Sequence, residues 1–232
     1  MTLDDLLDDI FDGAKPAFYR DFEGWVRGSR RFKEFATSYR SKIRAKLKNA
    51  RDERGMMALR AELETAALLL REERFTLEYE KYIAAKQRGP DFTVTFKTHT
   101  PFNVEVRCIY SLELDDKDIE TRTRKLVAVL CDKVGQMPPS IPNLLWLVAE
   151  REISEAELAH AEMTLRQLAE RKVEDFFTRR GFKSAADFLR QYHRLSGIVL
   201  RQSGANVLWL NPLARHKAPS EIVMAIQRLE SR

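Results

Sequence analysis

The spacing of apolar residues changes near residue 74, and this change limits the folds that are open to the chain. From 56 to 73 apolar residues recur every three or four positions, as on one face of a helix. From 75 to 79, 91 to 96 and 102 to 110 they alternate with polar residues, as in strands with one buried face. A helix from 116 to 136 and a continuously apolar run from 143 to 149 follow, and such a run suits a strand covered on both faces. The order predicts a mixed α/β fold.

These patterns divide the chain into three regions. We expect an N-terminal helical region over 1–55, an α-β-β-β-α-β core over 56–150, and a C-terminal extension over 151–232 that packs on the core. In the extension we expect a long helix over 154–179, a shorter one over 184–194 and a last one from Ser220. Two short strands, 197–202 and 206–210, should form a hairpin through Ser203, Gly204 and Ala205.

Composition indicates a folded intracellular protein. Hydrophobic residues make up 44% of the 232 residues, which is enough to build a buried core and excludes a disordered chain. Cys108 and Cys131 each lie among apolar residues, so we expect buried, reduced thiols. The start lacks the pattern of a signal peptide, and no apolar run approaches the roughly 20 residues that span a bilayer. We therefore expect a cytoplasmic protein that does not bind membranes.

The N-terminal region separates its charges. Its first twelve residues hold five aspartates, whereas 40–51 holds six basic residues and no acid. An apolar stripe with helical spacing runs through the basic segment, which predicts a helix with one buried and one positive face. A charge run is usually a solvated face; the alternative is a surface for nucleic-acid phosphates, because neutralising them releases counterions. The basic residues are Arg40, Lys42, Arg44, Lys46, Lys48 and Arg51.

Three acidic residues are candidates for a metal site. If the strands 91–96 and 102–110 pair as a hairpin, Asp91 at the start of one meets Glu105 toward the end of the other. Glu62 lies at the edge of the apolar face of the preceding helix, and its side chain can point across the sheet toward the hairpin. Each acid alone is typical of a solvated surface, but together they offer the oxygen ligands that Mg²⁺ prefers.

The same residues carry a resemblance to a known family. Gly89-Pro90-Asp91-Phe92, followed fourteen residues after Asp91 by Glu105-Val106-Arg107, resembles the motif of the PD-(D/E)xK nuclease superfamily. The order of elements over 56–150 also resembles that family's restriction-endonuclease-like core. The motif is short, so the resemblance rests on order and spacing together. It implies a metal-dependent nuclease that hydrolyses phosphodiester bonds in nucleic acid.

The resemblance also assigns roles to residues of this chain. Asp91 and Glu105 would be ligands of Mg²⁺ or Mn²⁺, and the Val106 carbonyl a backbone ligand. Glu62 would be a further ligand or would hold a metal-bound water. On the crossover helix, Lys133 and Gln136 resemble polar residues that some members direct into the site. Lys133 also suits the C-terminal end of a helix, where a positive charge interacts favourably with the helix dipole.

Arg107 departs from the family pattern, which has lysine at this position. Arginine supplies positive charge and bidentate contacts to phosphate, but it stays protonated and cannot accept a proton. Lys97 lies six residues from Asp91, about 20 Å along a strand, and is too far to substitute. Either Arg107 performs the electrostatic part of the role, or another lysine does, or the protein is inactive.

Three functions remain open on the sequence alone. The first is a nuclease that acts on nucleic acid, DNA rather than RNA, with the basic helix as a clamp on the backbone that does not read sequence. The second is a nuclease-like binding or assembly module without turnover, and the third a structural protein that binds neither metal nor nucleic acid. The assembly considered is a homodimer. The four histidines lack the spacing of a zinc site, and no phosphate-binding glycine loop is present.

Overall fold

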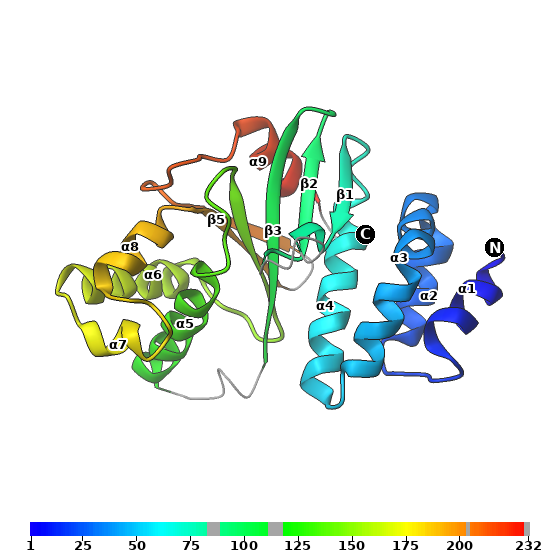
Figure 1. Ribbon diagram of the computed structural model, residues 1–232, viewed down its shortest axis with the longest axis horizontal. Helices are drawn as coiled ribbons and strands as arrows, with labels where there is room; N and C mark the ends of the chain where they lie inside the picture. The colour runs from blue at the N-terminus through cyan, green and yellow to red at the C-terminus, as the bar shows by residue number, and fades with distance from the viewer. Residues whose placement is uncertain (83–88, 111–117, 203–204, 230–232) are drawn as a thin grey trace.

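In the part of the chain that the structure describes, a six-stranded mixed sheet forms the centre (Figure 1). The computed structural model describes residues 1–82, 89–110, 118–202 and 205–229. The strands follow one another across the sheet in chain order; β1, β2 and β3 are antiparallel, β3, β4 and β5 are parallel, and β6 returns antiparallel to β5. Their bounds are β1 Phe75–Tyr79, β2 Phe92–Phe96, β3 Thr100–Ile109, β4 Asn143–Ala149, β5 Leu195–Gln202 and β6 Ala205–Leu210.

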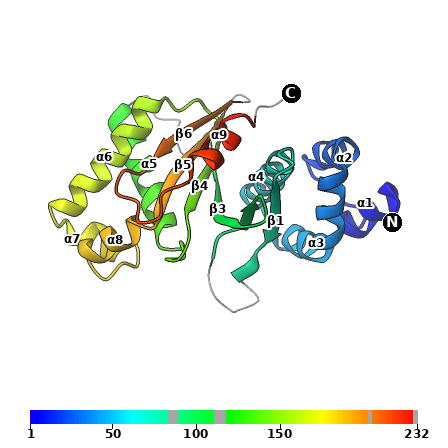
Figure 2. The same ribbon diagram turned by 90° about the horizontal axis from the view of Figure 1, so that it is seen from above.

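Helices cover both faces of the sheet, as Figure 2 shows from above. On one face α1 to α4 and α9 share a buried cluster with β1, β2 and β3; on the other, α5 to α8 share a second cluster with β4 and β5. The bounds on the first face are α1 Leu3–Phe11, α2 Tyr19–Gly28, α3 Arg30–Asn49, α4 Glu53–Leu69 and α9 Ser220–Gln227. Those on the second are α5 Ile119–Val134, α6 Glu155–Glu170, α7 Glu174–Thr178 and α8 Ala185–Tyr192.

The predicted α/β class is confirmed, and the order α4-β1-β2-β3-α5-β4 is the predicted one. The strands predicted at 75–79 and 143–149 have the predicted bounds. The helix predicted from 56 begins earlier, at Glu53, because the Asp52 side chain accepts a hydrogen bond from the Gly55 N–H at 2.8 Å and caps it. The predicted start of the next helix at 116 lies outside the described residues, and α5 begins at Ile119.

For the C-terminal extension, one prediction was wrong and one is confirmed. The single helix predicted over 154–179 is two helices, α6 and α7, because Lys172 between them adopts a left-handed backbone with φ of 54°. The predicted hairpin forms between β5 and β6, and it extends the sheet because β5 also pairs with β4 in parallel. Residues 203 and 204 of its turn lie outside the described ranges.

Helix α3 covers the edge of β1 and thereby fixes the position of its own C-terminal half. The Arg31 guanidinium donates to the carbonyl oxygens of Leu70 and Glu72 at 2.6 and 2.7 Å, and also to that of Phe75. One helix turn after the middle of α3, Lys42 donates to the Tyr79 carbonyl at 2.9 Å. An edge strand is usually protected in some such way. The residues that follow Lys42 on α3 are therefore held beside the end of β1.

Across the described ranges, no helix has both the length and the apolar character needed to cross a membrane.

Candidate metal centre

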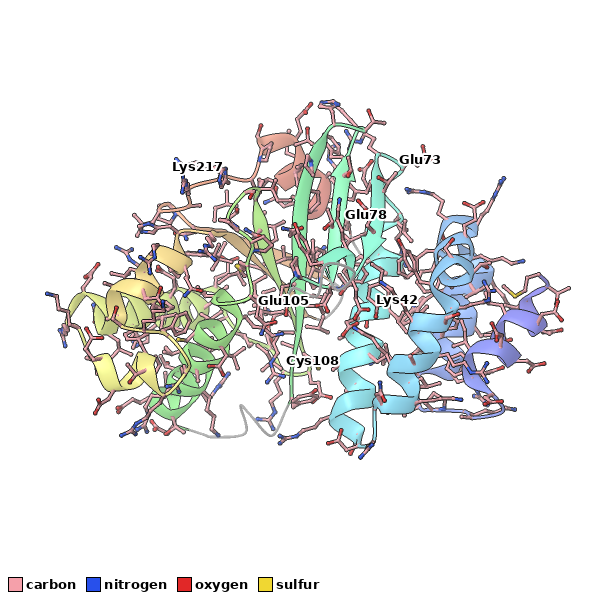
Figure 3. All side chains as sticks on the ribbon, in the orientation of Figure 1. Lys42, Glu73, Glu78, Glu105, Cys108 and Lys217 are labelled. Carbon is pink, nitrogen blue, oxygen red and sulfur yellow. The ribbon has the colours of Figure 1, made fainter. Side chains whose placement is uncertain are left out.

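The pairing of β2 with β3 brings two acids together. Phe92 pairs with Val104, so Asp91 and Glu105 face each other one step further along the strands. One carboxylate oxygen of Asp91 accepts a hydrogen bond from the Val106 N–H at 2.8 Å. Figure 3 shows Glu105 on the part of β3 that runs between α4 and α5, and its side chain is only 5% exposed.

Helix α4 brings Glu62 to the same place from one face of the sheet. The Glu62 carboxylate accepts hydrogen bonds from the Lys46 ammonium at 2.5 Å and from the Tyr79 hydroxyl at 2.6 Å. The Tyr79 ring in turn stacks on Phe92, with 5.2 Å between the ring centroids. This stacking joins Glu62 to the strand that begins beside Asp91.

Two further residues complete the cluster, and the sequence did not predict their place in it. The Lys46 ammonium lies 2.9 Å from the Glu80 carboxylate and 3.9 Å from that of Asp91, in addition to its contact with Glu62. Glu80 directly follows β1, with φ of 50°, and its N–H donates to the Asp91 carbonyl at 2.7 Å. The usable signal for Glu80 was its position just past a strand that has to pair with the start of β2.

Lys133 reaches the site from α5, on the opposite face of the sheet. Its ammonium donates to one carboxylate oxygen of Glu105 in a short contact. The other Glu105 oxygen is buried and has no hydrogen-bond partner among the described residues. Gln136 lies just past the end of α5, and within the described ranges its side chain makes no hydrogen bond to the acids.

The charges of the cluster alter the pKa values of its members. Burial, followed by the negative charges of Glu62 and Glu105, raises the pKa of Asp91 well above its usual value, against the lowering effect of Lys46. Burial likewise raises the pKa of Glu105, although Lys133 opposes the rise. Burial lowers the pKa of Lys46, but the carboxylates of Glu62 and Asp91 outweigh it and raise the pKa overall. The lysine is therefore a permanent cation in a group of acids that repel one another.

The Tyr79 hydroxyl stays protonated and acts as a donor. Burial, together with the charge of Glu62 and the hydrogen bond to it, raises the pKa of Tyr79 well above its usual value. Because the hydroxyl keeps its proton at neutral pH, Tyr79 fixes one oxygen of Glu62 in place.

Arg107 lies further along β3, with its guanidinium 5.7 Å from the centre of the Tyr110 ring. Lys97 pairs with Glu221 on α9 at 2.8 Å. The lysine that forms an ion pair with Glu105 is Lys133, on the crossover helix α5.

The basic residues of α3 from Arg40 to Lys48 divide between two acidic groups. Lys42 and Lys46 turn toward the end of β1 and the acids around it, where the Lys42 ammonium lies 3.9 Å from Glu80. The others form ion pairs with two aspartates of the first helix and its end, at 3.0 to 3.5 Å; they are Arg40, Arg44 and Lys48, paired with Asp9 and Asp12. Arg51 follows α3 and is exposed. Much of the positive face predicted for nucleic acid is thus neutralised by the chain itself.

Four acids of the cluster supply oxygen atoms of the kind that hard divalent cations bind. Asp91, Glu105, Glu62 and Glu80 offer carboxylate oxygens, and one buried Glu105 oxygen lacks a partner in the described residues. In the described ranges, no three Asp, Glu, His or Cys side chains stand close enough to form a ready metal cage; lysine ammonium groups lie against the acids instead. The chemistry of the oxygens fits Mg²⁺ or Mn²⁺.

Comparisons with known proteins do not identify the chain. No protein-family model, no curated protein and no solved structure matches it.

Proposed function

We propose that the protein is a metal-dependent nuclease with a restriction-endonuclease-like core. The observation that carries the proposal is the pair Asp91 and Glu105, which adjacent strands hold together and whose pKa values are both raised by burial. A buried carboxylate oxygen without a partner in the described residues adds to it, because an isolated buried acceptor is costly unless a ligand completes it.

In this proposal each residue has a definite task. Asp91, Glu105 and the Val106 carbonyl would hold the ion, and Glu62 would orient a water by hydrogen bonding. A bound Mg²⁺ supplies the Lewis acidity that activates water and neutralises charge on phosphate. The Lys133 ammonium, which contacts Glu105, provides the positive charge that the family motif places where this chain has Arg107. Arg107 binds a phosphate oxygen, since a guanidinium suits that contact.

The test is digestion of plasmid, linear and single-stranded DNA, and of RNA, with Mg²⁺ or Mn²⁺. We expect cleavage by the wild type and none above background by D91N or E105Q. The matched control is E78Q, because Glu78 lies on β1 near the site but pairs with Lys81 at 2.9 Å. Cleavage that survives both D91N and E105Q would refute the proposal.

The second candidate is a nuclease-like module that binds nucleic acid without turnover. Two observations favour it: arginine replaces the motif lysine, and the Lys46 ammonium lies among the acids. It predicts no cleavage with any divalent ion, together with binding whose log affinity falls linearly with log salt concentration.

A further inference from the structure

We propose that Lys46 is the resident counter-ion of the carboxylate cluster, and that a divalent metal ion binds by displacing its ammonium group. This inference rests on the proposed function, because two of the acids around Lys46, Asp91 and Glu62, are also residues of the proposed metal site. It adds a regulatory residue from α3, which lies outside the core that carries the nuclease-like motif.

The contacts of Lys46 are those of a cation held by several anions. Its nitrogen lies 2.5 Å from Glu62, 2.9 Å from Glu80 and 3.9 Å from Asp91, and these acids come from three different places: α4, the end of β1 and the start of β2. The nitrogen also lies 4.9 Å from the centre of the Tyr79 ring, whose electron-rich face favours a cation. One ammonium thus joins three backbone segments.

The ammonium is also able to leave. The Lys46 side chain is 26% exposed, so solvent reaches it, and four methylene groups allow the nitrogen to swing outward while α3 stays in place. The helix itself is held by the contacts of Arg31 and Lys42 with the edge of β1, neither of which involves Lys46. Displacement therefore requires rotation of a side chain rather than movement of a helix.

The same acids cannot serve the ammonium and a metal ion fully at once. An ammonium donates hydrogen bonds to carboxylate oxygens, and a divalent ion needs the lone pairs of those oxygens. The repulsion between two nearby cations adds to this competition. Lys46 should therefore weaken metal binding and keep the cluster folded when metal is scarce.

The experiment measures Mn²⁺ binding to the full chain by isothermal titration calorimetry. It also follows the electron paramagnetic resonance signal of free Mn²⁺, which is lost when the ion binds. We expect K46M to bind Mn²⁺ at least tenfold more tightly than the wild type, which corresponds to about 1.4 kcal/mol. K46R keeps the charge and should not gain affinity. The matched control is K48M, two residues along α3, whose lysine pairs with Asp12 at 3.5 Å; it should stay within twofold of the wild type.

A second pair of variants guards against loss of folding in K46M. Removing Lys46 leaves excess negative charge, so E80Q and K46M/E80Q are compared as well; the double variant restores the net charge and should bind Mn²⁺ more tightly than E80Q. Equal or weaker binding after removal of Lys46 in both backgrounds overturns the inference.

Cleavage assays on the same samples distinguish this inference from the proposed function. Cleavage by the wild type, with no gain of affinity in K46M, removes the inference and leaves the function. Binding gained by K46M without cleavage by any variant leaves the inference and removes the function. Absence of Mn²⁺ binding from both the wild type and K46M overturns both.

Discussion

The D91N substitution should stabilise the protein while it removes a ligand of the proposed metal site. The raised pKa of Asp91 means that the folded protein prefers its neutral form, because burial and the charges of Glu62 and Glu105 disfavour the anion. The D91N side chain has nearly the shape of the aspartate but no charge. Its amide oxygen can still accept the hydrogen bond from the Val106 N–H, which is 2.8 Å long in the wild type. The attraction to Lys46, at 3.9 Å, is lost, but that lysine keeps Glu62 and Glu80.

The size of the effect follows from relieving one unfavourable charge, which typically yields about 1 kcal/mol. For a chain of this size that is a rise in Tm of roughly 2–4 °C. A carboxyl group whose pKa is raised in the folded state contributes stability that is lost with rising pH. The free energy of unfolding falls between the pKa of the group in the unfolded chain, near 3.9, and its pKa in the folded protein. The advantage of D91N should therefore be absent below about pH 4 and should grow to a plateau at higher pH.

Thermal unfolding without metal at pH 4, 6 and 8 measures this effect. The matched control is D21N, because Asp21 forms an exposed pair with Arg60 at 3.0 Å whose loss should lower Tm slightly or leave it unchanged. With Mn²⁺ at a hundred times its Kd, the wild type should gain about 2.7 kcal/mol and D91N nothing. A Tm of D91N below that of the wild type at pH 8, without metal, would refute the electrostatic reasoning.

Three other substitutions or titrations test the structure. K133M should lower the free energy of unfolding by about 3 kcal/mol, because it leaves the Glu105 anion buried without its cation, and adding E105Q should restore most of the loss in urea unfolding. R31A should cost roughly 2–3 kcal/mol by removing charged donors from the carbonyls at the end of α4, whereas R31K should cost less. Burial raises the pKa of Cys131 to about 12, so the thiol should not react with a disulfide reagent at pH 8, and stability should fall between about pH 9 and 12 less in C131A than in wild type.

The sequence predicted the sheet near the site well, because the signals there are local. Alternation of apolar and polar residues defined β2 and β3, and a hairpin between such strands sets which residues lie opposite each other. That was sufficient to place Asp91 across from Glu105. Glu62 also followed from a local rule, its angle on the face of α4.

The residues that the sequence misplaced depend on contacts between distant segments. In the sequence Lys46 is one of several cations of a basic helix, and the residues next to it in the chain do not distinguish it from Lys48. The difference arises because Arg31 and Lys42 fix α3 along β1, which turns Lys46 toward the acids and leaves Lys48 beside Asp12. Helical periodicity gives the face of a residue, but it does not tell what the face will meet.

The placement of the lysines also changes how the arginine in the motif is to be understood. On the sequence, Arg107 stands where the resembled motif has a lysine, which left three possibilities: Arg107 performs the electrostatic role, another lysine does, or the protein is inactive. In the folded chain Lys133 contacts Glu105 from one face of the sheet, and Lys46 contacts Glu62 and Asp91 from the other. Positive charge is therefore present beside both proposed metal ligands, and Arg107 alone is no reason to exclude catalysis. The two lysines contact different acids, so K133M and K46M should have different consequences: the first should impair cleavage, and the second should raise the affinity for Mn²⁺.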